Sequence, residues 1–409
     1  MKIFALGGYG KTGLPAIKLL AKSNLITEIA IVGRNRDHAE KAATEIGEKA
    51  TAIQVDGMDI QMLITLSQGY DIIMNAASNE VMISSIQAAI HNKIHYCDVS
   101  WGEILGQTQQ LDSKAKAAGI SAIVATGISP CISNLMGVHV ARHLDEVQQF
   151  QIGRADIYNF ETGRELTPKQ WLDDSESKGL VGLDEFKPFI SWMLQRLGEE
   201  GIRTVQDYHN GQWVEVDPVR NGVEIPLPEG GTIKSYPFWS GDDFFGTLPN
   251  EFSKTSPVEI WFSSFPPQLH SVLREQALRI LEEGIDHEDA INTFYDTLES
   301  DPNRWLTLPD DFNLNTKIWV RAVGQTEGRA VRSTCWFSTP MWNVGGYFLT
   351  SVALVAAILK ILRGEIIERG VFTAEKAFDP QSFFDDVVAI LPDPPPDGKL
   401  VNESFEWLQ

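Results

Sequence analysis

The first 130 residues alternate between short apolar segments and segments of helical character. Six of the apolar segments have the composition of strands: Lys2–Leu6, Ile29–Val32, Ala52–Val55, Asp71–Ala76, Tyr96–Val99 and Ala122–Ala125. Helical patterns stand between most of them, as in Leu14–Lys22, His38–Ile46 and Val81–His91. Parallel strands need a long crossover connection, which is usually a helix, so this order predicts βαβ units. We therefore expect an α/β domain with a doubly wound parallel sheet of the Rossmann type.

A glycine-rich turn follows the first predicted strand and reads GGYGKTG from residue 7 to residue 13. Its glycines match the pattern GxGxxG, which needs glycine for the tight turn, for close approach of a pyrophosphate and for helix–strand packing. The N-terminus of the next helix presents N–H groups and a positive dipole end to phosphates. The strand and helix on either side favour a dinucleotide site over a plain glycine-rich turn. The candidate cofactor-binding residues are Gly8, Tyr9, Gly10, Lys11, Thr12 and Gly13.

The end of the second predicted strand bears on the choice between NAD and NADP. An NAD site usually places an acidic residue here, on the ribose 2′-hydroxyl. This strand instead ends in Gly33-Arg34-Asn35-Arg36. Glycine leaves room, and Arg34, with Asn35 or Arg36, can pair with a 2′-phosphate. Arginines are also common on surfaces, but the missing acid makes us favour NADP(H) over NAD(H).

Two later strand ends are expected to complete the cofactor pocket, because ligands of open α/β sheets bind beyond the carboxyl ends of the strands. Asp56 follows the third strand, where it could meet the adenine amino group. Asn75, Ala76 and Ala77 follow the fourth, where small residues let the nicotinamide half pass close to the backbone. Ordinary loop chemistry is the alternative for all four.

The region from about Cys131 to about Pro340 has a different texture. Nine of the 11 tryptophans fall between Trp171 and Trp342. Short strands are predicted at Trp213–Val216, Gly222–Ile225 and Ile233–Trp239, helices at Ser271–Gly284 and Glu288–Glu299, and a hairpin at Lys317–Val323 with Ala330–Phe337. We expect an α+β domain with an antiparallel sheet. A helix at Phe378–Ile390 and an extended proline-rich tail follow.

The segment Met341–Leu359 is apolar over about the length that spans a bilayer. Its small residues, which suit close helix packing, favour a buried helix instead, and we expect no stable membrane insertion.

The chain is strongly acidic, with 34 basic and 55 acidic side chains and a formal net charge of −21. Such a surface repels phosphate backbones, so we expect no nucleic-acid partner. Ten of the acids fall between Glu282 and Asp311, which predicts a solvated face there. Three cysteines cannot form a disulfide framework, and the N-terminus lacks the apolar core of a signal peptide, so we expect a cytoplasmic location.

Several segments together resemble the saccharopine dehydrogenase family. They are GGYGKTG, GRN after the second strand, QVD after the third, MNAAS after the fourth, HYCDVS after the fifth and GISPCISN after the sixth. HNGQWVEV, the TLP of GDDFFGTLP and RGEIIERGVFTAEKAFDP are similar to that family farther along the chain. The resemblance covers most of the chain and is most specific in the first 140 residues.

The resemblance implies a nicotinamide-dependent oxidoreductase that interconverts the C=N bond of an imine, formed from an amine and a carbonyl compound such as a keto acid, with a secondary amine. The family includes carboxynorspermidine-forming enzymes. It implies a Rossmann domain at 1–130, an α+β substrate and dimerisation domain inserted at 131–340, and C-terminal helices at 341–409 that pack back on the first domain. A homodimer is the commonest soluble oligomer and is expected here.

This sequence departs from the family after the sixth strand, where Ser129-Pro130-Cys131 replaces a common Asp-Pro-Gly. This departure and the apolar segment Met341–Leu359 leave open a catalytically diverged NADPH-binding scaffold or interaction protein. The aromatic-rich second domain leaves open a reductase of a C=C bond in an apolar substrate.

Imine reduction needs a proton donor and a dry, well-positioned site. Tyr96 and Asp98 alternate onto one side of the fifth strand, and with Cys131 they are the candidate catalytic residues. A helix cap is the alternative for Asp98, and simple burial is the commoner fate of a lone cysteine such as Cys131. Candidate substrate-binding residues are Ser129, Pro130, Trp239 and Arg203. The scattered histidines predict no metal site.

Overall fold

The computed structural model describes residues 1–100, 104–157, 205–209, 212–217, 222–228, 230–237, 258–265, 267–300, 318–337 and 346–408. These residues divide into two units, which are described separately below. Unit 1 contains Met1–His139 and Gly346–Leu400. Unit 2 contains the described residues from Val140 to Phe337, together with Val401 to Leu408.

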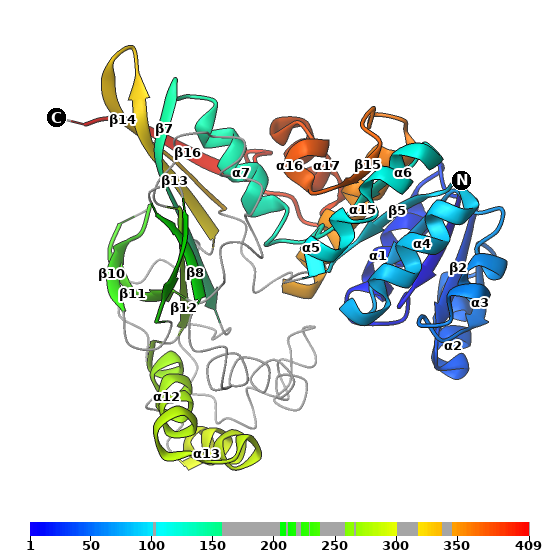
Figure 1. Cartoon of the computed structure of the whole chain (residues 1–409), viewed down its shortest axis with the longest axis horizontal. Coiled ribbons are helices and arrows are strands. Elements are labelled where there is room, and N and C mark those ends of the chain that lie inside the picture. Colours follow the sequence, from blue (N-terminus) through cyan, green and yellow to red (C-terminus); the bar gives the residue numbers. More distant parts are fainter. Residues whose placement is uncertain are drawn as a thin grey trace. The chain divides into compact units, whose positions relative to one another are not determined.

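Unit 1 is built on a seven-stranded sheet in the order β15-β6-β5-β4-β1-β2-β3, in which every neighbouring pair is parallel (Figure 1). Its strands are β1 (Lys2–Leu6), β2 (Glu28–Gly33), β3 (Ala50–Gln54), β4 (Ile72–Asn75), β5 (His95–Asp98), β6 (Ser121–Ile123) and β15 (Gly370–Phe372). The Rossmann-type doubly wound sheet is therefore confirmed. The sequence pattern did not predict β15, a three-residue strand that pairs with β6 from far along the chain.

Helices connect the strands and cover the sheet. They are α1 (Gly13–Lys22), α2 (Arg36–Ile46), α3 (Ile60–Leu66), the short 3₁₀ turn η1 (Asn79–Val81), α4 (Met82–Asn92), α5 (Ile104–Gln109), α6 (Asp112–Ala118) and α7 (Ile132–Ala141), which leads into unit 2. The start of α2 is set by Asn35, whose side chain accepts a hydrogen bond from the backbone N–H of His38 at 3.0 Å. Asp59 caps α3 in the same way through Met62.

The apolar segment near residue 350 forms α15 (Gly346–Leu362), which packs against α1, β5 and α17 (Pro380–Ile390) inside unit 1. The side chains from Leu349 to Ile358 are almost all buried. Near its end, Lys360 is also buried, and its ammonium pairs with Glu365 and Asp386 at 2.9 Å each. Among the described residues, no helix combines the length and hydrophobicity needed to cross a bilayer.

Unit 2 is built on a nine-stranded sheet with the main order β10-β11-β12-β7-β13-β14-β16, in which β8 pairs with β12 and β9 (Figure 1). Its strands are β7 (Glu146–Ile157), β8 (Val205–His209), β9 (Gln212–Val216), β10 (Val223–Pro226), β11 (Thr232–Pro237), β12 (Val258–Phe265), β13 (Ile318–Thr326), β14 (Arg329–Phe337) and β16 (Val401–Trp407). Its helices are α12 (Pro267–Leu278), the π-helical turn η2 (Arg279–Glu283) and α13 (His287–Ser300).

Two features of this sheet differ from expectation. The sheet is mixed, because β12 pairs with β7 in parallel, whereas we expected antiparallel strands throughout. The extended tail also ends in a strand: β16 pairs antiparallel with β14 in unit 2, although we expected residues 341–409 to return to the first domain. The other segments of that C-terminal region, α15, β15, α16 (Ala374–Ala377) and α17, lie in unit 1.

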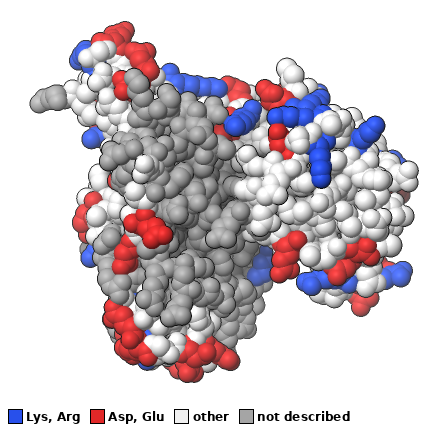
Figure 2. Space-filling model, in the orientation of Figure 1, with Lys and Arg blue, Asp and Glu red and all other residues white. Residues whose placement is uncertain are grey.

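The predicted acidic face covers the end of unit 2 formed by α12 and α13, where Figure 2 shows acidic side chains gathered. The exposed acids there are Glu282, Glu283, Asp286, Glu288 and Asp289. Much of the negative charge of unit 2 is therefore solvated.

The centre of the unit 2 sheet is set by an indole ring that lies against bare backbone. Trp319 of β13 is fully buried and stands opposite Gly153 of β7. A Cβ atom on Gly153 would lie 1.9 Å from the Trp319 ring, so glycine is required at this position. Ile225, Leu227 and Ile233 complete the cluster, and this tryptophan is accordingly a core residue.

We expect Gly153→Ala to destabilise the protein by about 3 kcal/mol, because the added methyl overpacks a fully buried ring. Urea unfolding measures the change. Gly106→Ala is the matched control, since that glycine lies in α5 with open space around it and should gain up to about 1 kcal/mol. Equal stabilities for the two variants would contradict this packing.

Candidate functional site

The turn between β1 and α1 is fixed by close backbone contacts. Gly7 has a φ of +72°, and a Cβ atom there would lie 2.6 Å from the backbone nitrogen of Ala77. A Cβ atom on Gly13 would lie 2.0 Å from the carbonyl oxygen of Gly7. The turn can therefore form only if both residues lack a side chain, and it brings the start of α1 against the loop after β4.

Gly10 differs from these two glycines, because the atoms around it leave more room for a Cβ atom. Its φ is not positive, and the nearest atom to an added Cβ would be the Gly7 carbonyl oxygen at 3.2 Å. This position is the second glycine of GxGxxG, at which the backbone must approach a pyrophosphate. The geometry thus fits a glycine that is needed at residue 10 for the approach of a ligand rather than for the folding of the turn.

A cavity of about 500 Å³ lies at the tip of β2, on the adenosine side of the predicted site. It is lined by Tyr9, Arg34, Asn35, Arg36, Asp37 and Gln54. The structure therefore brings together three predicted cofactor residues: Tyr9, Arg34 and Asn35. Sequence reasoning missed Asp37 and Gln54; Gln54 could have been found as the residue that ends β3 at the same edge of the sheet.

The role of Gly33 differs from the one we expected. We expected this glycine to leave room for a 2′-phosphate, but the Tyr9 phenol occupies the room: an added Cβ would lie 2.5 Å from its oxygen. The same oxygen accepts a hydrogen bond from the Asn35 N–H at 3.1 Å. Tyr9 is therefore the fixed inner wall of the cavity.

The cations and polar groups around this cavity are not equivalent. Arg36 is paired with Glu40 at 2.7 Å, one helical turn along α2, and the Asn35 side chain is committed to capping that helix. Arg34 is exposed at the mouth, and its carbonyl oxygen is held by Gln54 at 3.0 Å. Asp56 is exposed after β3 and accepts a hydrogen bond from the Met58 N–H.

Asn75 shapes the loop after β4. It is buried, its amide oxygen accepts from the Ala77 N–H at 3.0 Å, and its amide nitrogen donates to the Tyr96 hydroxyl at 3.1 Å. Ala76 donates its own N–H to the Leu6 carbonyl at 2.9 Å. The small residues therefore lie beside the glycine turn because Asn75 holds the loop there.

Tyr96 and Asp98 share one side of β5, as alternation predicted, and both are completely buried. The Tyr96 hydroxyl donates to Asp98 Oδ2 at 2.8 Å. Asp98 Oδ1 accepts from the Ser100 N–H and hydroxyl and from the Ala125 N–H. Burial raises the pKa of Asp98, an effect that these four donors partly offset, and burial beside that carboxyl raises the pKa of Tyr96.

This network ties together the ends of β4, β5 and β6. A proton donor must come within hydrogen-bond reach of the reacting atom, and here the donor and acceptor atoms face each other in the interior. The catalytic role of Tyr96 and Asp98 remains a prediction. Their contacts suit residues that position the surrounding loops.

Cys131 occupies a strained position in the loop after β6. Its side chain is 1% exposed and its φ is +97°, a region that favours glycine. Burial raises the pKa of its thiol well above the usual value, so this cysteine stays protonated. The neighbouring Ser129 hydroxyl accepts from Ser133 at 3.0 Å, and Pro130 is buried.

Two of the predicted substrate residues, Arg203 and Trp239, belong to unit 2 and lie outside the described residues. Other arginines of unit 2 are engaged. Arg321 donates to Gln151 and to the Pro226 carbonyl, and burial beside Arg332 lowers its pKa.

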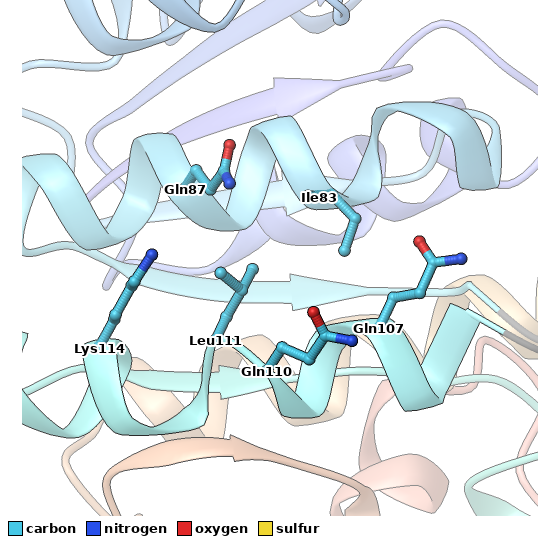
Figure 3. A pocket seen from close by; sticks show the side chains of 6 residues that line it. All are labelled: Ile83, Gln87, Gln107, Gln110, Leu111 and Lys114. Carbon is cyan, nitrogen blue, oxygen red and sulfur yellow. The ribbon is translucent and has the colours of Figure 1, made fainter.

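A second cavity of unit 1 is shown in Figure 3. Its lining comes from α4, α5, α6 and the turn between the last two: Ile83, Gln87, Gln107, Gln110, Leu111 and Lys114. Its lining contains no carboxylate, thiol or hydroxyl side chain, and its one ionisable group is the Lys114 amine.

Comparison with known proteins agrees with this geometry. Residues 3–123 match the model of the saccharopine dehydrogenase NADP binding domain. The chain is 22% identical to carboxynorspermidine synthase of Vibrio alginolyticus, over 95% of both chains. Its fold resembles saccharopine dehydrogenase (L-Glu forming) of Saccharomyces cerevisiae, with a TM-score of 0.68, 14% identity and 99% of each chain covered. It also resembles homospermidine synthase of Legionella pneumophila in complex with NAD, with a TM-score of 0.56, 11% identity, and 100% and 91% coverage.

The positive φ at residue 131 predicts that glycine is more stable than alanine at this position. We expect Cys131→Gly to be more stable than Cys131→Ala by about 1–2 kcal/mol, because both lose the thiol and only glycine relieves the positive φ. Chemical denaturation of both variants measures the difference. The reverse order, which is normal for helices and strands, would show that the backbone at this position is not strained.

Proposed function

We propose, from the premise that the chain belongs to the saccharopine dehydrogenase-like family of NAD(P)-binding oxidoreductases, that it is an NADP(H)-dependent enzyme of the saccharopine reductase type. In this proposal it transfers hydride to or from the C=N bond of an imine. The imine forms from an amine and a carbonyl compound, and the product is a secondary-amine amino acid or a polyamine-like molecule.

The observation that carries the cofactor assignment is the cavity at the tip of β2. Arg34 stands at its mouth where an NAD site usually has an acid, and a guanidinium is the usual partner of a phosphate. Asp37 lines the same cavity and could accept a ribose hydroxyl, which favours NAD(H) as the second candidate. Arg34 lies directly at the end of β2, so we favour NADP(H).

Other residues of unit 1 bind the pyrophosphate and hold the loops around the reacting atoms. The glycine turn and the first N–H groups of α1 bind the pyrophosphate. A bound nicotinamide supplies the hydride. Asn75 and Asp98 hold the loops after β4, β5 and β6 in place, which fixes the edge of the sheet where the imine carbon must approach.

The substrate class rests on similarity along the whole chain. Carboxynorspermidine synthase aligns with 95% of this sequence, so the likeness extends beyond the cofactor domain. A polyamine-like amine combined with a keto acid or another carbonyl compound is the substrate class that follows. The Ser129-Pro130-Cys131 segment motivates the alternative of a diverged NADPH-binding scaffold. The aromatic-rich second domain motivates the C=C reductase, which is less favoured because Trp319, a tryptophan of that domain, is a core residue.

A homodimer and a cytoplasmic location remain predictions from the sequence.

We expect the protein to bind NADPH more tightly than NADH, and Arg34→Ala to weaken NADPH binding by roughly 10- to 100-fold while NADH binding changes little. A guanidinium–phosphate pair contributes about 1.5–3 kcal/mol, which corresponds to that range. Calorimetric titration of both cofactors measures the difference.

Arg36→Ala is the control for that titration, because this arginine lines the same cavity but is paired with Glu40. It should leave both affinities within about twofold. Tighter binding of NADH by the unsubstituted protein would reject the NADP(H) assignment, and no binding of either cofactor would reject the oxidoreductase.

A screen of amines paired with keto acids or aldehydes, followed by NADPH absorbance, tests the reaction itself. We expect oxidation of NADPH only when both partners are present, because the imine forms from the two together. Oxidation by an apolar enone without an amine would indicate the C=C reductase instead. Tight NADPH binding with no turnover across polyamine-like pairs would favour the scaffold.

A further inference from the structure

The path of the cofactor across unit 1 follows from the sheet order. The pyrophosphate binds at the turn between β1 and α1, and the adenosine half leaves over β2 toward the Arg34 cavity. The nicotinamide half must therefore leave in the opposite direction, over the ends of β4, β5 and β6. What flanks the site on that side decides how this half is held.

The first turn of α15 lies on that side and contacts the loops around the site. The Ser351 hydroxyl donates to the Thr12 carbonyl at 2.7 Å, which ties α15 to the glycine turn. Thr350 lies against the loop after β6, since its methyl is 3.3 Å from the position of a Cβ on Gly127. The start of α15 therefore stands between the glycine turn and the β6 loop.

Tyr347 is one of two aromatic residues in this first turn, beside Phe348. The Lys11 ammonium lies 5.7 Å from the centre of its ring. Tyr347 is 41% exposed, although most of α15 is buried. A large, partly exposed ring beside the pyrophosphate turn offers a flat apolar surface to a sugar or nicotinamide ring, and it keeps an ammonium near the phosphates.

We propose that Tyr347 is a cofactor-binding residue, whose ring forms the wall for the nicotinamide half and holds Lys11 beside the pyrophosphate. This inference rests on the proposed NADP(H) function and extends it to a helix more than 330 residues away in the sequence. It also gives the apolar C-terminal helix a part in the site: its buried length anchors the ring, and Ser351 sets its distance from the glycine turn.

The test compares the whole cofactor with its adenosine half. Tyr347→Ala should weaken NADPH binding by roughly fivefold to tenfold, the range of one aromatic contact. Binding of adenosine 2′,5′-bisphosphate, which lacks the nicotinamide half, should change less than about twofold. Tyr347→Phe keeps the ring and should bind both ligands as the unsubstituted protein does. Phe405→Ala removes a similarly exposed ring, 43% against 41%, from unit 2 and should change neither affinity.

Each other outcome overturns the proposal. Unchanged NADPH binding by Tyr347→Ala would show that the ring is not part of the site. An equal loss for both ligands, or a lower melting temperature with a parallel loss, would show a general effect on the fold. If the unsubstituted protein binds neither ligand, the proposed function fails first and this inference falls with it; binding of both ligands without an effect of Tyr347 would leave the proposed function intact.

Discussion

Unit 1 depends on the close approach of backbone at the turn between β1 and α1. Gly13 lies against the backbone of Gly7, and Gly7 lies against the loop after β4, at distances that no side chain permits. This contact sets where α1 starts, and so where its free N–H groups point. It also brings the Asn75 loop to the edge of the same turn. Tyr9, between the glycines, is then carried onto Gly33 and becomes the wall of the cavity at the tip of β2. One constraint on side-chain volume thus places three parts of the proposed cofactor site: its phosphate-binding end, its adenosine side and the first part of its nicotinamide side.

The buried carboxyl of Asp98 holds the loops in place at β5 and β6, which lie on the opposite side of β1 from β2. A buried carboxylate is costly unless its oxygens are satisfied, and here Tyr96, Ser100 and Ala125 supply four donors. The donors lie within β5, in the loop after β5 and in the loop after β6. The network therefore resists movement of the loops after β5 and β6, and Tyr96 extends it to Asn75 at the end of β4. Catalysis by hydride transfer demands placement more than reactive side chains, so a rigid edge of this kind suits the proposed reaction.

How much of this could be predicted from the sequence depends on the range of the interactions involved. The six strands of the first 130 residues were predicted with small boundary errors, because each is apolar and flanked by helical patterns. The seventh strand, β15, has three residues and exists through its pairing with β6, a contact that no local pattern reports. The long strand β7 was missed because its sequence, EVQQFQIGRADI, is largely polar, and its place in the sheet comes from pairing with β12 and β13. In the site, glycine spacing predicted the turn correctly. The packing of Tyr9 on Gly33 could not be predicted, because it depends on where a side chain points after the turn has formed.

The three candidate catalytic residues are all buried, which limits the proton transfers in which they can take part. Tyr96, Asp98 and Cys131 are each at most 1% exposed, and burial raises the pKa of every one. At Cys131 the backbone has a positive φ that glycine adopts easily, so the thiol stands in a strained loop. The thiol itself stays protonated, because burial raises its pKa. A protonated, buried thiol cannot replace the charge of the acid that the family resemblance leads us to expect two residues earlier, where Ser129 stands here. Reduction of an imine that is already protonated needs no such acid, whereas formation of the imine from its two components does need proton transfer. In the proposed reaction, the departure at Ser129-Pro130-Cys131 therefore bears on the condensation step more than on the hydride step.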